Sequence, residues 1–252
     1  MKITFLGTGT STGVPEIGCT CPVCTSEDPR DRRLRVSILV EIDDARILID
    51  CGPDFREQML RVSFDRLDGV LLTHEHYDQT GGIDDLRPFC RFGDIDIFAD
   101  GTTCTHLRER LPYLFKEVLY PGVPRLHFHD VEPYRPFSVQ GVEVLPLQVM
   151  HGMLPILGYR IGPLGFVTDM LTAPEATYEA LRGVDVLIVN ALRPFAHASH
   201  QTIDDAIAFA QKVSAKETYL VHMSHQAGLH ADTDVQLPQH VRLAYDGLVI
   251  TR

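Results

Sequence analysis

Short hydrophobic runs alternate with polar and glycine-rich segments along the whole chain. Residues 2–6 alternate apolar and polar positions, which predicts a strand that ends at Gly7. Comparable runs predict further strands at 36–42, 46–50, 69–73, 94–99, 142–147, 165–168, 184–189, 217–221 and 248–251. Segments with helical periodicity lie between several of these runs, at 55–62, 102–114, 174–181 and 202–213. The pattern predicts sheets layered with helices.

Nothing in the chain marks a domain boundary, since there is no internal repeat, low-complexity segment or break in composition. Sandwich folds of about 200–250 residues are common as one domain, so we expect a single domain over residues 1–252. The stretch at about 11–35 differs from the rest, because it holds prolines, glycines, three cysteines and a run of arginines. It is either an insertion with its own purpose or a disordered loop.

The balance of acidic and basic residues limits the classes of molecule that this protein is expected to bind. Asp and Glu number 34 against 23 Lys and Arg, which gives a formal net charge of −11. This disfavours long nucleic acid, whose binding needs clustered basic side chains. No stretch approaches the roughly 18 consecutive apolar residues of a membrane helix, and the opening residues are too short for a secretory signal. We expect a cytoplasmic protein with neither a membrane nor a long nucleic acid as partner.

Polar side chains follow the ends of five predicted strands. They are His74, His151, Asp169, Asn190 and His222. Ligands converge past the carboxyl ends of strands in layered folds, because the scaffold there is rigid and the side chains reach solvent. These residues are therefore candidates for one shared site.

The first of these loops also holds His76 and Asp78, which with His74 fall at every second position. Such spacing places three side chains on one side of an extended segment. A His-x-His pair alone usually marks a surface loop, but imidazoles and carboxylates at several strand ends are the ligands of zinc, manganese or iron. Two metal ions bridged by a carboxylate can hold both the attacking and the leaving oxygen of a displacement reaction. Asp169 is the candidate bridge.

Cys19, Cys21 and Cys24 cluster within the segment at 11–35. Prolines and glycines around them offer no core face, and a cytoplasmic chain disfavours a disulfide framework, so a metal site is the favoured interpretation. The remaining cysteines are isolated and are expected to be core or surface residues: Cys51, Cys90 and Cys104.

The motif at 73–79, Thr-His-Glu-His-Tyr-Asp-Gln, resembles the signature of the metallo-β-lactamase superfamily, as do Gly82 and the later His151, Asp169 and His222. Residues 48–52 resemble that family's early Ile-Asp-x-Gly element, in which the Asp, here Asp50, supports the histidine loop. The resemblance implies an α/β (α+β) fold, an αββα sandwich with two mixed β-sheets face to face and helices outside.

The cysteine segment resembles the extra zinc site of PhnP-like phosphodiesterases, which is completed by a histidine three residues after the last active-site histidine. Here that residue is His225. Three thiolates and one imidazole form a closed tetrahedral set, as in a structural zinc site. The resemblance implies hydrolysis of small phosphodiesters, cyclic ones included, and a homodimer.

The resemblance also implies residue roles. One ion would be held by His74, His76 and His151, a second by Asp78 and His222, with Asp169 as bridge and a metal-activated hydroxide as nucleophile. His200 resembles the proton donor to the leaving group, a role that suits an imidazole near its usual pKa of about 6.5. His197 is its rival.

Gln79 departs from the family pattern, which commonly has His after the motif Asp. A neutral amide is a much weaker ligand for a transition metal. The second ion is therefore expected to be loosely held, absent, or a harder cation such as Mn²⁺ in place of Zn²⁺.

Other functions fit the same residues. The fold could process RNA 3′ ends, hydrolyse a β-lactam or a thioester, or serve a PQQ-biosynthesis-like role. A non-catalytic metal-binding module, with Gln79 marking the loss of the second ion, is the alternative from another class. The natural substrate is not specified by any motif.

Overall fold

The computed structural model describes residues 1–116, 118 and 120–252, and within these residues the strands form two seven-stranded sheets. The first sheet runs in the order β14 (Val249–Thr251), β1 (Lys2–Gly7), β2 (Ser37–Ile42), β3 (Ala45–Ile49), β4 (Gly69–Leu71), β5 (Ile95–Ala99) and β6 (Leu126–Asp130). The second runs in the order β13 (Val241–Leu243), β12 (Glu217–Val221), β11 (Val186–Asn190), β10 (Leu164–Val167), β9 (Leu154–Ile161), β8 (Val142–His151) and β7 (Phe137–Val139). Both sheets mix parallel and antiparallel pairs.

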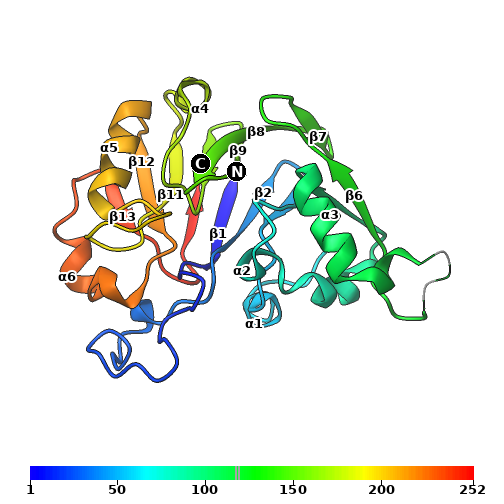
Figure 1. Cartoon of the computed structure of the whole chain (residues 1–252), viewed down its shortest axis with the longest axis horizontal. Helices are drawn as coiled ribbons and strands as arrows, with labels where there is room; N and C mark the ends of the chain where they lie inside the picture. The colour runs from blue at the N-terminus through cyan, green and yellow to red at the C-terminus, as the bar shows by residue number, and fades with distance from the viewer. Residues whose placement is uncertain (117, 119) are drawn as a thin grey trace.

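Helices flank the two sheets on their outer sides (Figure 1). Those beside the first sheet are α1 (Phe55–Met59), α2 (Tyr77–Thr80) and α3 (Gly101–Arg110). Those beside the second are α4 (Glu175–Leu181), α5 (Ile203–Val213) and α6 (His230–Asp234). Short 3₁₀ segments occur at η1 (Pro29–Asp31), η2 (Ile83–Arg91), η3 (Pro112–Phe115) and η4 (His225–Ala227). The predicted αββα sandwich is confirmed.

Three hydrophobic clusters hold these layers together. The central cluster lies between the sheets and includes Ile47 and Ile49 from β3 with Tyr159 and Phe166 from the second sheet. A second cluster packs the second sheet against α4 and α5, and a third packs the first sheet against α1, η2 and α3. Buried apolar area of this kind is the main stabilising term in folding, and it fixes the sheet edge where the polar loops meet.

Helix α5 begins where the sequence predicted. Thr202 is its N-cap and accepts a hydrogen bond from the Asp205 backbone N–H, while the Asp205 carboxylate accepts one from the Thr202 backbone N–H. This reciprocal arrangement satisfies two backbone donors at the helix start. It also fixes the direction of the segment that carries His200.

The sequence missed four strands: β6, β7, β9 and β13. Strand β9 contains Pro155 and Gly158, which are unfavourable in a strand pattern, but its antiparallel pairing with β8 stabilises the strand. Strand β8 extends to His151, beyond the predicted end at residue 147, because β9 continues the ladder from His151 to Leu145.

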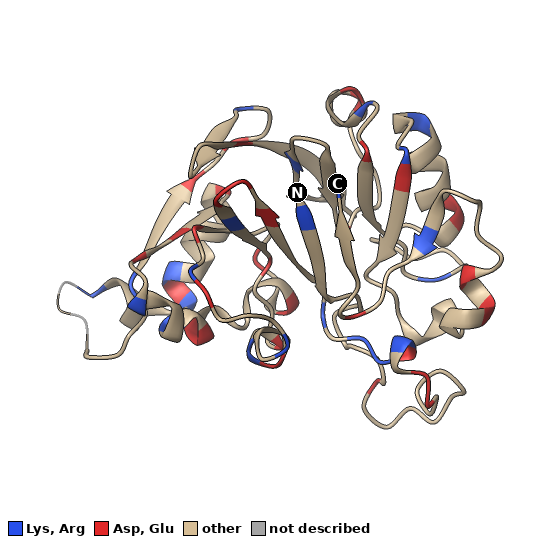
Figure 2. Cartoon of the chain, turned by 180° about the vertical axis from the view of Figure 1, so that it is seen from behind, with Lys and Arg blue, Asp and Glu red and all other residues tan. Residues whose placement is uncertain are grey.

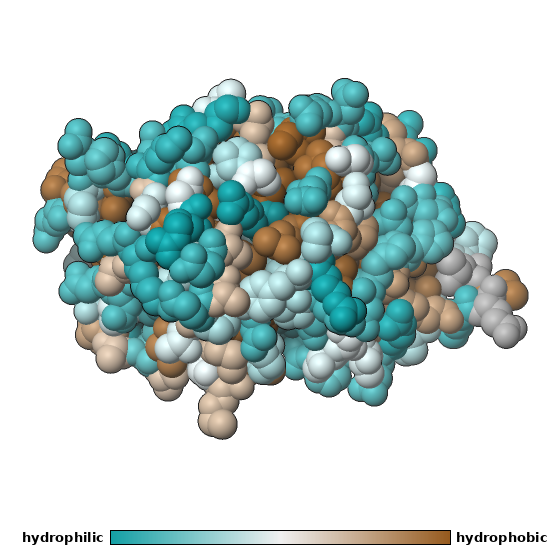
Figure 3. Space-filling model, turned by 90° about the horizontal axis from the view of Figure 1, so that it is seen from above, coloured by the Kyte–Doolittle hydropathy of each residue, from teal (hydrophilic) through white to brown (hydrophobic). Residues whose placement is uncertain are grey.

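The two ends of the chain lie side by side, since the Met1 amino group donates to the Arg252 carbonyl oxygen at 2.7 Å. Basic and acidic residues are interspersed over both halves of the molecule (Figure 2). The face seen from above is mostly hydrophilic, with hydrophobic residues in patches towards its middle (Figure 3). Within the described residues, none of the helices combines the length and the apolar character needed to cross a membrane.

Candidate metal centre

The candidate ligands lie where strands of both sheets end. His151 is the last residue of β8, Asp169 lies two residues beyond β10, and His222 directly follows β12. His74 lies three residues beyond β4. Residues separated by up to 148 positions are thereby gathered at one edge of the sandwich.

Asp78 corrects one sequence expectation. It lies in the first turn of α2, so the segment from His74 to Asp78 is not extended throughout. The turn forms because the Thr80 hydroxyl donates to the carbonyl oxygen of His76 at 2.8 Å, and the Gly81 N–H donates to that of Tyr77. The helical turn aims Asp78 inward and leaves it 8% exposed.

Three polar residues at strand ends adopt left-handed backbone conformations. The φ angles are 60° at Asp50, 55° at Asp169 and 58° at His222. Such values are uncommon for residues other than glycine and cost free energy, which the surrounding structure must supply. All three belong to the candidate centre or support it, whereas the other non-glycine residues with positive φ among the described residues lie in turns: Asp43, Tyr134, Gln140 and Ser214.

Two groups of donor atoms meet at Asp169. Among the described residues, the possible ligand atoms of Asp78, Asp169 and His222 all lie within 4.8 Å of one another, and so do those of His151, Asp169 and His200. His222 Nε2 lies 3.0 Å from Asp169 Oδ1 and 3.6 Å from Asp78 Oδ2. Asp169 is thus the side chain common to both groups.

His74 and His76 lie beside these groups without belonging to either. The ring centroid of His151 is 5.7 Å from that of His74 and 5.2 Å from that of His76, and the rings of His74 and His76 are 4.5 Å apart. The structure therefore brings all three predicted imidazoles into contact. It also groups His200 with His151, which the sequence did not predict.

The donor set fits divalent transition-metal ions. His74 Nε2, His200 Nδ1 and Gln79 Oε1 are buried and have no hydrogen-bond partner. Buried polar atoms are normally paired, so such atoms require an explanation, and coordination of a metal ion would supply one. Imidazole nitrogens and carboxylates at one point are ligands that zinc and manganese accept.

Hydrogen bonds orient the imidazoles. The Asp50 carboxylate accepts from the Thr73 backbone N–H at 2.8 Å and from its hydroxyl at 3.0 Å, and that hydroxyl lies 3.1 Å from His74 Nδ1. His151 Nδ1 lies 2.8 Å from the Asp169 carbonyl oxygen. In each case Nδ1 takes part in a hydrogen bond, so Nε2 is left to bind a metal ion. The predicted support of the histidine loop by Asp50 is therefore present as these bonds.

Electrostatics within the centre favour a proton or a cation beside the carboxylates. Burial by itself would lower the pKa of His222, but Asp169 and Asp78 outweigh it and raise that pKa to about 10. Burial would raise the pKa of Asp169, yet His222 and His74 hold it below its ordinary range. Burial lowers the pKa of His74 to about 4, so this imidazole is neutral near pH 7 and suited to ligation.

Gln79 is fully buried between the two carboxylates. Its Nε2 donates to Asp78 Oδ2 at 2.9 Å and approaches Asp169 Oδ2 at 3.3 Å. The amide group therefore acts as a hydrogen-bond donor to two candidate ligands. A role for Gln79 as a ligand stays a prediction.

His200 lies deeper in the centre than His197. Its ring centroid is 4.7 Å from that of His151 and 4.9 Å from that of His222, whereas the His197 ring contacts His200 at 5.0 Å. Burial, followed by the neighbouring His222, lowers the pKa of His200 to about 3. The expectation of a pKa near its usual value is wrong, because a buried imidazole has lost the water that stabilises its charge.

A second cluster joins the loop between β1 and β2 to the start of η4. The Cys19, Cys21 and Cys24 sulfurs and a His225 nitrogen all lie within 4.8 Å of one another, and His225 Nδ1 is 3.1 Å from Cys19 Sγ. Glu16, which the sequence analysis missed, lies 3.2 Å from His225 Nε2 and orients this ring. A backbone hydrogen bond from Cys24 lowers the pKa of Cys21 to about 6, towards the thiolate that zinc binds.

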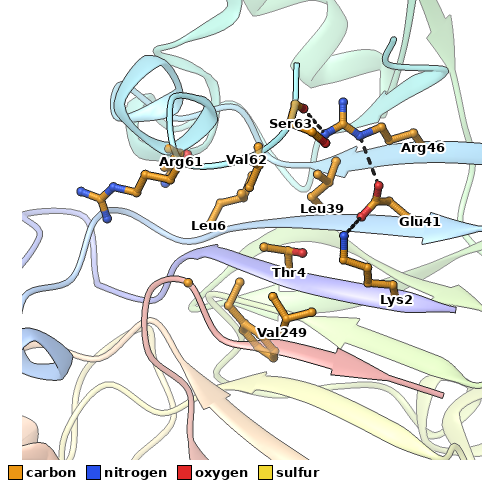
Figure 4. Close-up of a pocket in the computed structure, with 13 residues that line it drawn as sticks. Lys2, Thr4, Leu6, Leu39, Glu41, Arg46, Arg61, Val62, Ser63 and Val249 are labelled. Atoms are coloured by element: carbon orange, nitrogen blue, oxygen red, sulfur yellow. Dashed lines mark hydrogen bonds and ion pairs between the residues drawn. The ribbon is translucent and has the colours of Figure 1, made fainter. Parts of the chain in front are cut away.

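A separate cavity of about 350 Å³ lies on the outer face of the first sheet, near α1 (Figure 4). Three of its charged side chains pair with one another, since Lys2 Nζ lies 2.7 Å from Glu41 Oε2 and Arg46 Nε lies 3.7 Å from Glu41 Oε1, and Arg61 pairs with Glu57. None of the candidate metal ligands lines it. It is distinct from the metal centre.

Comparisons with known proteins agree with this geometry. The family model described as a β-lactamase superfamily domain matches residues 45–223. A protein of Porphyromonas gingivalis named octanoyltransferase is 47% identical over 250 residues, which cover 98% of this chain and 51% of that protein. The chain spans about half the length of these curated relatives, Coenzyme PQQ synthesis protein B of Rhodopseudomonas palustris included.

Solved structures share the whole fold. A crystal structure described as a new diphosphatase from the PhnP family has a TM-score of 0.92 and 39% identity, covering 100% of this chain and 97% of that one. Zn²⁺-bound PqqB from Methylobacterium extorquens has a TM-score of 0.75 at 17% identity, with full coverage of both chains, and shows the fold alone. The chain therefore belongs to the metallo-β-lactamase superfamily and is PhnP-like, as its histidine and cysteine motifs indicated.

Proposed function

We propose that this protein is a metal-dependent hydrolase that cleaves small phosphodiesters. The observation that carries the proposal is the convergence of two donor groups on the shared carboxylate of Asp169. The solved PhnP-family relative, described as a diphosphatase, supports a reaction at phosphorus. The acidic net charge of −11 favours a small substrate over a long nucleic acid.

The ions of the two candidate sites would have different roles. One divalent ion, Zn²⁺ or Mn²⁺, would be held by His74, His76, His151 and Asp169, and a second by Asp78, Asp169 and His222. When bound, such ions lower the pKa of water and stabilise the negative charge that develops on the phosphoryl oxygens. The cysteine cluster would hold a structural Zn²⁺, because its four donors leave no open position.

The side chains of this protein would position these ligands and move a proton. Asp50 and Thr73 hold the His74 ring, and the Asp169 carbonyl oxygen holds that of His151. His200 would donate a proton to the leaving oxygen. Its lowered pKa means that it needs a nearby anion to become protonated at neutral pH, and the phosphodiester itself supplies one.

The test is a substrate panel with protein supplied with Mn²⁺ or Zn²⁺. Bis(p-nitrophenyl) phosphate, p-nitrophenyl phosphate, an octanoyl thioester and a β-lactam are compared for wild type and Asp169→Asn. We expect the diester to have the highest kcat/KM and the variant to lose its turnover. Cleavage of the monoester alone, or equal background rates for both proteins, would contradict the proposal.

Thioester hydrolysis is the second candidate, favoured by the relative named octanoyltransferase. The matched region covers 51% of that protein, so its name does not say which half carries the transferase activity. Turnover of the octanoyl thioester without turnover of the diester would replace the leading proposal. Absence of turnover on every compound, with metal bound, would favour a non-catalytic metal-binding module.

A further inference from the structure

A cavity of about 420 Å³ adjoins the metal centre. It is lined by the first half of β9, with Leu154, Ile156 and Leu157, and by the start of α3, with Thr102 and Thr103. His74 lines it too, so this candidate metal ligand faces both the centre and the cavity. Its volume lies in the range of ligand pockets, roughly 300–1,000 Å³.

The charges of this cavity exclude an anionic occupant. Neither Lys nor Arg lines it in the part of the chain that the structure describes. The Asp100 carboxylate already caps α3, accepting from the backbone N–H groups of Thr102 at 2.9 Å and Thr103 at 3.1 Å. Glu75, the other carboxylate of the lining, pairs with His106. A second phosphate placed here would meet carboxylates and no cation.

The residues of β9 that line the cavity determine which kind of ligand group fits there. Leu154, Pro155, Ile156 and Leu157 follow one another in this lining, and Ile156 and Leu157 are each 2% exposed. Ile156 and Leu157 pack in the hydrophobic clusters, so the apolar area that a ligand group can cover comes from the half-buried Leu154 and the exposed Pro155. Gln148 and the two threonines offer single hydrogen bonds. The matching group is uncharged and mainly apolar.

We propose that this cavity binds the uncharged, mainly apolar substituent of the phosphodiester, the one that stays on phosphorus when the leaving alcohol departs. The assignment rests on the proposed function. It makes Leu154 of β9 and Thr102 of α3 determinants of substrate size. It places the phosphate at the metal centre beside His74 and the organic group between β9 and α3.

The experiment uses three diesters with the same p-nitrophenolate leaving group and a second substituent that is methyl, phenyl or 4-carboxyphenyl. For the wild type we expect a KM about tenfold lower for the phenyl ester than for the methyl ester, because burial of the ring is favourable. The 4-carboxyphenyl ester loses this advantage. Equal KM values for the methyl and phenyl esters overturn the assignment.

Two variants fill the cavity from two different elements, Leu154→Trp from β9 and Thr102→Trp from α3. Each is expected to bring the KM values of the phenyl and methyl esters to within about twofold of each other, because the added ring occupies the space that the phenyl group would fill. Met153→Trp is the matched control, since Met153 is 95% exposed and does not line the cavity. Circular dichroism checks that each variant folds, and Thr102 is already exposed and tolerates a larger side chain.

The outcomes separate the two proposals. Persistence of the phenyl preference in both tryptophan variants overturns the pocket and leaves the phosphodiesterase proposal standing. Absence of cleavage of all three esters by the metal-supplied wild type overturns the proposed function, and the pocket assignment with it.

Discussion

The two candidate metal sites of this protein are built in opposite ways. The cysteine cluster takes three donors from six consecutive residues of one loop, and His225 completes it. The histidine–aspartate centre takes its donors from the ends of strands in both sheets, and Asp169 and His222 are 2% and 0% exposed. A site of neighbouring residues depends on local chain geometry, whereas a site of distant residues depends on the whole sandwich.

One segment joins them. His222 contributes to the histidine–aspartate centre, and His225, three residues later, contributes to the cysteine cluster. Between these two residues, the Met223 backbone N–H donates to the Thr8 carbonyl oxygen. We infer that the cluster fixes the loop that follows β12 and thereby the position of His222. The comparison predicts that damage to the centre removes chemistry and spares the cluster, whereas damage to the cluster removes stability first.

The largest effect is expected from Asp169→Ala. Loss of the carboxylate common to both donor groups should lower kcat/KM for a phosphodiester by at least about 10³-fold, the scale of losing charge stabilisation in a transition state. Elemental analysis should show loss of the ions of the centre and retention of about one zinc in the cluster. Asp204→Ala, at an exposed position of α5, is the control and should keep both. Unchanged turnover would remove Asp169 from the mechanism.

Cys21→Ser should lower the free energy of unfolding. At free zinc near 1,000 times the dissociation constant, a bound ion contributes about 4 kcal/mol to the free energy of unfolding, and the variant should lose most of it. Denaturant unfolding and zinc content measure this loss, and kcat should fall less than about tenfold.

Cys90→Ser is the matched control for Cys21→Ser, because Cys90 is buried outside both sites. It should keep its zinc. Equal zinc content in Cys21→Ser and wild type would contradict the cluster as a metal site.

Asp246 tests how the cysteine loop is anchored. Its carboxylate accepts from the Thr8 hydroxyl at 2.8 Å and from the Leu34 backbone N–H at 2.7 Å, residues that flank the loop. Burial raises the pKa of Asp246 from 3.8 to about 6. The folded state therefore holds this proton more tightly than the unfolded state, so the stabilising contribution is complete below about pH 4 and is lost as the pH rises through about 6.

The measurement compares wild type with Asp246→Asn by denaturant unfolding at pH 4 and pH 6.5. The stability of wild type relative to the variant should fall by up to about 3 kcal/mol between these values, since a shift of one pKa unit corresponds to about 1.4 kcal/mol. Turnover near neutral pH should not change. A difference that is equal at both pH values would show that Asp246 does not titrate in this range.

The smallest effect concerns the support of His74. Thr73→Val removes the hydroxyl between Asp50 and His74 and should weaken metal binding at the centre by about 10–100-fold. Thr73→Ser keeps the hydroxyl and should keep the affinity. Competition with a fluorescent chelator measures both constants, and identical constants for the two variants would show that the hydroxyl is not needed.

Much of the fold was readable from the chain, because buried strands leave short apolar runs and α5 carries its own capping residues. The αββα sandwich followed from these runs together with the family motifs. The strands that were missed have sequence patterns that are unfavourable for a strand by themselves, and only pairing with neighbouring strands makes them strands. Strand β9, with Pro155 and Gly158, is an example. The helical turn at Asp78 was missed because its stabilising bonds run from Thr80 and Gly81 to backbone carbonyl oxygens.

By itself the sequence determined which residue types are available to bind metals and where they fall relative to the strand ends, since both depend only on local order along the chain. The tertiary structure alone decided that His200 lies with His151 and Asp169, that Gln79 donates to two carboxylates, and that β9 and α3 enclose a cavity beside His74. Distances between residues far apart in the chain, and the pKa shifts that burial causes, arise only when the two sheets pack together.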